Sequence, residues 1–150
     1  MEYTISGKLI KGYQVASGIA QNTPFAGGTI ELQKPFFKHL GLNLDDFFMG
    51  TLNIDISPYT FKIVNSTYTF KDVKWTLNFP AETFSFAKCK IKFMQNWYEG
   101  YIYYPHPETK IGHFQKNTIV ELLAPYIEDI AYGNRVELII YKEEIELYEE

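Results

Sequence analysis

The stretch with the most evident chemistry is residues 50–56, Gly-Thr-Leu-Asn-Ile-Asp-Ile. Apolar and polar residues alternate here, which predicts a strand whose successive side chains point to opposite faces. The apolar side chains would enter a core, and Thr51, Asn53 and Asp55 would lie together on the other face. A hydroxyl, an amide oxygen and a carboxylate are oxygen ligands of the kind that Mg²⁺ takes in proteins. The alternative interpretation is the ordinary solvated face of an amphipathic strand.

The elements that must position these side chains are mainly strands. The chain has 150 residues, which fits a single domain over residues 1–150, and 17% of them are aromatic. Aromatic side chains are enriched in strands. Short apolar or alternating runs separated by turn residues recur along the chain, a spacing typical of a sandwich or barrel. We therefore expect a small closed β-barrel with two short helices.

The pattern predicts the following boundaries. Strands are expected at residues 3–11, 13–20, 29–32, 51–56, 59–64, 67–73, 75–79, 85–94, 98–104, 118–123 and 136–141, with 59–64 and 67–73 forming a hairpin around Asn65-Ser66. Helices are expected at residues 34–40, ended by Gly41, and directly after Pro125. Residues 143–150 are expected to form a solvated last strand and tail.

Charge and composition exclude several partners. The net charge is −4, but residues 137–150 hold six Glu against Lys142, a local balance of −5 that leaves about +1 for the rest. Arg135 is the only arginine, so the Arg contacts and basic stripe of a nucleic-acid surface are missing. The first residues do not resemble a secretory signal, and no apolar run approaches the roughly 18 residues of a membrane span. We expect a cytoplasmic protein that binds neither nucleic acid nor membrane.

The other reactive residue types have simpler interpretations. His106 and His113 flank Glu108 on a Pro-rich turn, but no third metal ligand is evident nearby. His39 is expected to be packed on an apolar helix. Cys89 lies between lysines that would lower its thiol pKa if it were exposed, but a small core residue is the preferred interpretation.

Several segments also resemble a known protein family. Residues 50–54 resemble the Gly-Thr-Leu-Asn-apolar motif of the archaeal-type, CTP-dependent riboflavin kinases. Further segments are similar to that family in the same order: residues 7–12, 36–41, 100–105 followed by Thr109 and His113, and 120–125.

The resemblance implies a fold, a reaction and roles for individual residues. The implied fold is a six-stranded cradle-loop barrel, and the implied reaction transfers the γ-phosphoryl group of CTP to riboflavin, giving FMN and CDP. Thr51 and Asn53 would bind Mg²⁺, and Thr109 and Glu121 would contact the flavin. Glu121 would also hold the acceptor hydroxyl or accept its proton.

The nucleotide side departs from the family pattern. Of the family's glycine-rich phosphate loop only Gly12 and, less clearly, Gly18 remain, and an insertion follows. Glu128 and Asp129 occupy a stretch in which the family has basic residues, and two carboxylates would repel a polyphosphate. A kinase with a rearranged loop, a kinase with another nucleoside triphosphate donor, and a non-catalytic flavin- or nucleotide-binding barrel all remain open. A carbohydrate-binding domain has only the exposed aromatic residues in its favour.

Overall fold

The computed structural model describes residues 1–10, 29–48, 50–77, 80–106 and 118–149. The elements in these ranges are β1 (Glu2–Ile10), α1 (Thr29–His39), β2 (Leu52–Asp55), β3 (Tyr59–Ile63), β4 (Tyr68–Val73), β5 (Glu82–Phe93), β6 (Asn96–Pro105), β7 (Ile119–Leu123), β8 (Arg135–Tyr141) and β9 (Ile145–Glu149). The protein is mainly β, as predicted. The strand expected at residues 13–20, together with Gly12 and Gly18, lies outside the described residues.

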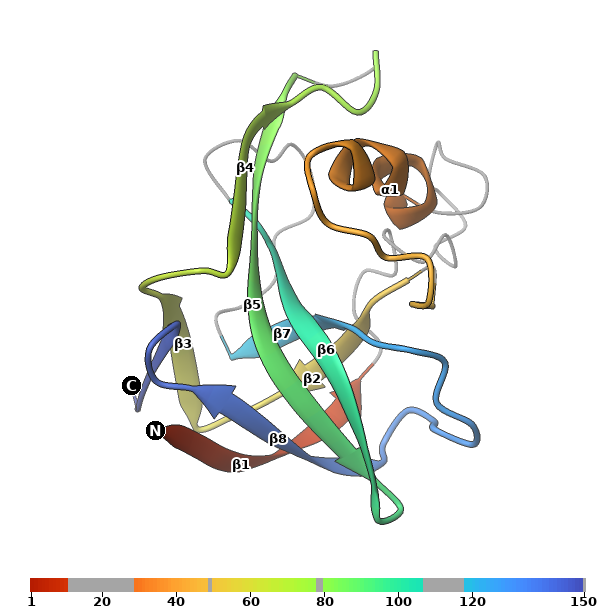
Figure 1. Ribbon diagram of the computed structural model, residues 1–150. Helices are drawn as coiled ribbons and strands as arrows, with labels where there is room; N and C mark the ends of the chain where they lie inside the picture. The colour runs from red at the N-terminus through yellow and green to blue at the C-terminus, as the bar shows by residue number, and fades with distance from the viewer. Residues whose placement is uncertain (11–28, 49, 78–79, 107–117, 150) are drawn as a thin grey trace.

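Six antiparallel strands close into a ring, which confirms the expected closed six-stranded sheet (Figure 1). The order is β5-β6-β7-β2-β1-β8, and β8 pairs back onto β5. Strand β5 is long enough to pair with two strands along one edge. Its first half pairs with β4 and its second half with β8. Strands β3 and β9 form a separate two-stranded sheet.

The ring encloses an apolar core to which every ring strand contributes alternate side chains. Ile54 of β2, Ile102 of β6, Leu122 of β7 and Leu138 of β8 are fully buried in it. Because successive strand residues face opposite sides, the neighbours of these residues lie on the outside of the ring. The outer face therefore carries the polar residues of β2 and β7.

A second core lies between the outer face of the sheet and α1 (Figure 1). The ring of Phe37 packs edge-on against Phe84 and Phe86 of β5, with centroids 5.1 and 5.0 Å away. Ile30 of α1 is also fully buried here. This packing holds α1 over the outer face of the sheet.

The expected strand at residues 29–32 is wrong, because these residues begin α1. Ile30, Gln33 and Phe37 are buried and spaced three and four residues apart, which is the periodicity of a helix face. A four-residue window is too short to separate this pattern from a strand. Gly41 follows the helix at a φ of +114°, consistent with its expected role as the stop.

The expected hairpin between residues 59–64 and 67–73 is also wrong. Strand β3 pairs with β9, and β4 pairs with β5. The backbone N–H groups of Val64 and Asn65 donate to the carbonyl of Glu144, at 2.8 and 3.2 Å, and thereby hold the supposed turn against the β8–β9 connection. The C-terminal segment forms a strand, β9, as expected. It pairs with β3 in place of residues 67–73, which the sequence predicted as the partner.

Two smaller elements differ from expectation. Residues 74–77 form no strand, and Trp75 is buried under α1. The segment after Pro125 forms turns and no helix. Asp129 has a φ of +65° and Gly133 a φ of +93°, so a right-handed helix is interrupted before it completes a second turn. Among the described residues no helix is long and apolar enough to cross a membrane.

We predict that the Phe37→Ala substitution lowers the free energy of unfolding by about 3–5 kcal/mol, because it removes a fully buried ring and leaves a cavity under α1. Urea denaturation followed by circular dichroism measures the change. Phe36→Ala, the same substitution one residue earlier at a side chain that is 40% exposed, is the matched control and should cost less than half as much. Equal losses for the two variants would contradict the packing role of Phe37.

Candidate functional site

The candidate site is built on the pairing of β2 with β7. Asn53 and Glu121 are direct cross-strand partners, so their side chains lie on the same face of the sheet. Thr51 lies on that face too, because its hydroxyl donates to Glu121 Oε1 at 3.3 Å. The structure therefore brings together three of the residues singled out in the sequence. Ile54, next to Asn53 in the alternation, is fully buried in the ring core.

Asp55, the third polar residue of the 50–56 segment, has another role. Its Oδ1 accepts hydrogen bonds from the backbone N–H and the hydroxyl of Ser57, at 2.9 and 2.7 Å. These bonds shape the turn that follows β2. Asp55 is thus a turn residue, and the oxygen cluster consists of Thr51, Asn53 and Glu121.

A row of polar side chains crosses three strands at this point. Glu121 of β7 is the direct partner of Asn53 on one side and of Tyr103 of β6 on the other. Asn53 and Tyr103 are buried, and Glu121 and Thr51 are partly exposed. The row Tyr103–Glu121–Asn53 therefore places a partly exposed carboxylate between two buried side chains.

Helix α1 contributes to the same layer. Gln33 is only 2% exposed, and its Oε1 accepts a hydrogen bond from the Tyr103 hydroxyl at 2.7 Å. In the second core, the Trp75 indole N–H donates to the buried carboxylate of Glu82 at 2.6 Å. Burial raises the pKa of the Tyr103 hydroxyl well above its ordinary value, and the charges of Glu121 and Glu82 raise it further. Tyr103 therefore keeps its proton across the physiological pH range.

The sequence pattern pointed neither to Gln33 nor to the Tyr103 hydroxyl as part of the site. A signal for Gln33 exists: it is a polar residue on the helical face formed by Ile30 and Phe37. A buried amide needs a hydrogen-bond partner. That signal could be used only after residues 29–33 were assigned to a helix.

The donor set fits Mg²⁺ better than a transition metal. Hydroxyl, amide and carboxylate oxygens make up the cluster, and Mg²⁺ commonly takes one or two such ligands from protein and the remainder from phosphates and water. Among the described residues no group of three or more His, Cys, Asp or Glu side chains is placed to hold a metal ion. Thr51, Asn53 and Glu121 are the described residues that could contribute to an Mg²⁺ site.

The remaining predicted site residues, Gly12, Gly18 and Thr109, lie outside the described residues, as do Glu108 and His113. The gap that contains Gly12 and Gly18 begins directly after β1. Ile10, the last residue of β1, is the cross-strand partner of Asn53. The chain that leads to Gly12 thus leaves the described structure beside the oxygen cluster.

The acidic residues after Pro125 are exposed, and the turn that follows them is hydrogen-bonded to the end of β1. Glu128 and Asp129 both face solvent. The Leu9 N–H donates to the Asn134 carbonyl at 2.9 Å, and the Gly133 N–H donates to the Leu9 carbonyl at 2.7 Å. Residues 133 and 134, a few positions after the two carboxylates, therefore lie at the same end of β1 as the segment leading to Gly12.

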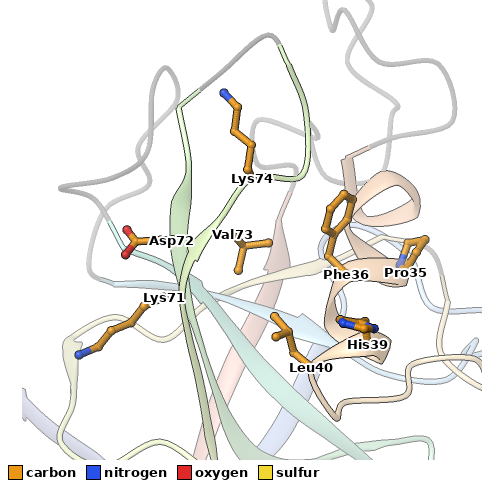
Figure 2. Close-up of a pocket in the computed structure, with 8 residues that line it drawn as sticks. All are labelled: Pro35, Phe36, His39, Leu40, Lys71, Asp72, Val73 and Lys74. Carbon is orange, nitrogen blue, oxygen red and sulfur yellow. The ribbon is translucent and has the colours of Figure 1, made fainter.

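The exposed His39 lies away from the oxygen cluster, and its expected packing is wrong. It lines a hollow of about 520 Å³ between α1 and β4, bordered by Phe36, Leu40 and Val73 (Figure 2). The side chains of two further lining residues, Lys71 and Asp72, point away from the helix (Figure 2). The described site residues Thr51, Asn53 and Glu121 do not line this hollow, which is formed at the β4 end of the sheet.

His106 takes part in a chain of hydrogen bonds. Its Nε2 lies 2.7 Å from the hydroxyl of the buried Ser85, which lies 3.1 Å from the Thr69 hydroxyl. Its backbone N–H donates to the Thr83 carbonyl at 2.9 Å. These contacts fix the end of β6 where the segment containing Thr109 begins.

No protein-family model matches the chain, and no curated protein matches it.

We predict that Cys89 does not react with iodoacetamide at pH 8 in the native protein. Burial raises the pKa of its thiol far above the ordinary value, so the reactive thiolate is not formed, and the sulfur is also inaccessible. Mass spectrometry of the labelled protein provides the measurement. The same chain in 6 M guanidinium, and a Trp97→Cys variant at an exposed site, should both be labelled. Rapid native labelling of Cys89 itself would contradict its position in the ring core.

Proposed function

We propose that this protein is a riboflavin kinase-like phosphotransferase, which moves the γ-phosphoryl group of CTP, or of another nucleoside triphosphate, to the 5′-hydroxyl of riboflavin. The observation that carries the proposal is the meeting of Thr51, Asn53 and Glu121 on one face of the β2–β7 pair. These are the residues to which the resemblance assigns the metal and the acceptor hydroxyl. A packed apolar face, or Thr51 and Asn53 on opposite sides, would have removed its basis.

Glu121 is proposed to accept the proton of the riboflavin 5′-hydroxyl as this oxygen forms a bond to the γ-phosphorus. The bond between the γ-phosphorus and the bridging oxygen breaks, and CDP leaves with the electron pair. The Thr51–Glu121 hydrogen bond is 3.3 Å long, beyond the usual 2.5–3.0 Å for O–H···O, so a substrate hydroxyl can displace it at little cost. Thr51 would then turn its oxygen toward the phosphate side of the site.

Thr51 and Asn53 are proposed to hold Mg²⁺ through a hydroxyl and an amide oxygen. When bound, the ion neutralises charge that develops on the transferred phosphoryl group and the leaving nucleotide. Phosphoryl transfer depends mainly on such positioning and charge stabilisation. The buried side chain of Asn53 offers its oxygen from a strand whose register is fixed on both edges, by β1 and by β7.

A second candidate is a flavin- or nucleotide-binding protein without turnover. The exposed Glu128 and Asp129 favour it, because they lie a few residues before a turn that is hydrogen-bonded to the end of β1 beside the oxygen cluster. Carboxylates at this position would oppose a triphosphate. The assay below separates the two functions.

We expect purified protein incubated with riboflavin, Mg²⁺ and CTP to form FMN, detected by chromatography, with ATP, GTP and UTP tested as alternative donors. Glu121→Gln should lower kcat about 100-fold, the usual scale for removing a general base. Thr51→Val should lower kcat at least about 10-fold and raise the Mg²⁺ concentration needed for half-maximal rate.

The matched controls carry the same substitutions on other ring strands. Thr4→Val on β1 and Glu137→Gln on β8 replace exposed side chains and should leave the rate within about twofold. Absence of FMN with every donor, together with riboflavin binding detected by quenching of its fluorescence, would assign the non-catalytic function. No FMN and no flavin binding would reject both.

A further inference from the structure

The Tyr103 hydroxyl is influenced by two carboxylates but gives its proton to an amide. It has a single proton, which it donates to Gln33 Oε1 at 2.7 Å. Glu121 is its direct cross-strand neighbour, and the charges of both Glu121 and Glu82 act on it. Hydrogen bonds to a charged acceptor are about twice as strong as those between neutral groups. A neutral amide therefore holds the Tyr103 proton, while a carboxylate, a stronger acceptor, occupies the paired position on the neighbouring strand.

The position of Gln33 makes this arrangement specific. Gln33 occupies the buried face of α1 together with the fully buried Ile30 and Phe37, where an apolar side chain would avoid the cost of desolvating an amide. The helix that carries it is fixed by Phe37 against β5. Gln33 is thus held where its oxygen reaches the Tyr103 hydroxyl.

A shift of the Tyr103 proton to Glu121 would change the hydrogen bonding of the Glu121 carboxylate. The Thr51 hydroxyl donates to Glu121 in a long bond of 3.3 Å that a substrate hydroxyl can displace. A Tyr103–Glu121 bond would be short and charge-assisted, and it would occupy a lone pair that the proposed function needs for the acceptor hydroxyl. It would also draw the carboxylate toward the interior under α1.

We propose that Gln33 is a positioning residue that holds the Tyr103 proton away from Glu121 and so keeps a lone pair of the Glu121 carboxylate for the acceptor hydroxyl. This inference rests on the proposed function. Gln33 touches no substrate in it; it acts through Tyr103, from a helix that belongs to the second core.

A double-mutant cycle tests the inference in the full chain. Gln33→Leu removes the amide acceptor at similar volume, and the Tyr103 proton then turns to Glu121. We expect kcat for FMN formation to fall about 10-fold, with the KM for the nucleoside triphosphate within about twofold of the wild-type value. In the Tyr103→Phe background there is no phenolic proton that could move to Glu121. The same Gln33→Leu substitution should therefore change kcat less than about twofold.

The split between kcat and KM distinguishes this role from a merely structural one. If Gln33 only stabilised the packing of α1, KM values would rise and the unfolding temperature would fall together with kcat, whereas the proposed role lowers kcat alone. Gln33→Met, which keeps an unbranched side chain without the acceptor, serves as a second variant should Gln33→Leu fold poorly. Tyr98→Phe on the same strand is the control for removal of a tyrosine hydroxyl, and thermal unfolding of each variant accompanies the kinetics.

The outcomes separate this inference from the proposed function. A wild-type protein that forms no FMN overturns both. Active wild-type protein in which Gln33→Leu and Gln33→Met keep the wild-type kcat overturns the role of Gln33 alone. Equal losses in the Tyr103 and Tyr103→Phe backgrounds also overturn it, because the effect would then not pass through the Tyr103 proton.

Discussion

The antiparallel register between β2 and β7 is the constraint on which the candidate site depends. It sets Asn53 opposite Glu121 and, one pair further along, the apolar Ile54 opposite Val120 in the ring core. A slip of one residue would exchange these faces, bury the polar side chains in the ring and expose the apolar ones. Burial of the ring core therefore specifies the same register that assembles the oxygen cluster. The stability of the fold and the geometry of the site have a common origin.

Helix α1 covers part of the outer face of the ring and keeps water away from it. Phe37, Phe84 and Phe86 exclude water from the Tyr103 end of the row Tyr103–Glu121–Asn53. Glu121 itself stays partly exposed. At such a boundary, hydrogen bonds are stronger than in water and unpaired polar groups are costly. The Gln33–Tyr103 and Trp75–Glu82 bonds meet that requirement in the layer under the helix.

Local alternation was sufficient to predict part of this structure. The alternating segments at residues 51–56, 85–94 and 136–141 correspond to β2, β5 and β8, with shifts of at most three residues at their ends. Alternation also separated the apolar side chains of residues 50–56 from Thr51 and Asn53. It failed where the deciding contact is distant in sequence: β3 pairs with β9 across the chain, and the bonds from Val64 and Asn65 to Glu144 replace the expected hairpin turn.

From the sequence alone came the β-rich class and the polar face of residues 50–56, because strand periodicity is a local property that neighbouring residues reveal. Glu121 became a separate candidate only through the family resemblance. Only the tertiary structure decided that Glu121 lies beside Asn53, that Tyr103 continues the row and that Gln33 reaches it from α1. The contacts of Glu121 with Asn53 and Thr51, and of Gln33 with Tyr103, join residues 68 to 70 positions apart. They are set by strand register and helix packing, which arise when the whole chain buries its two cores.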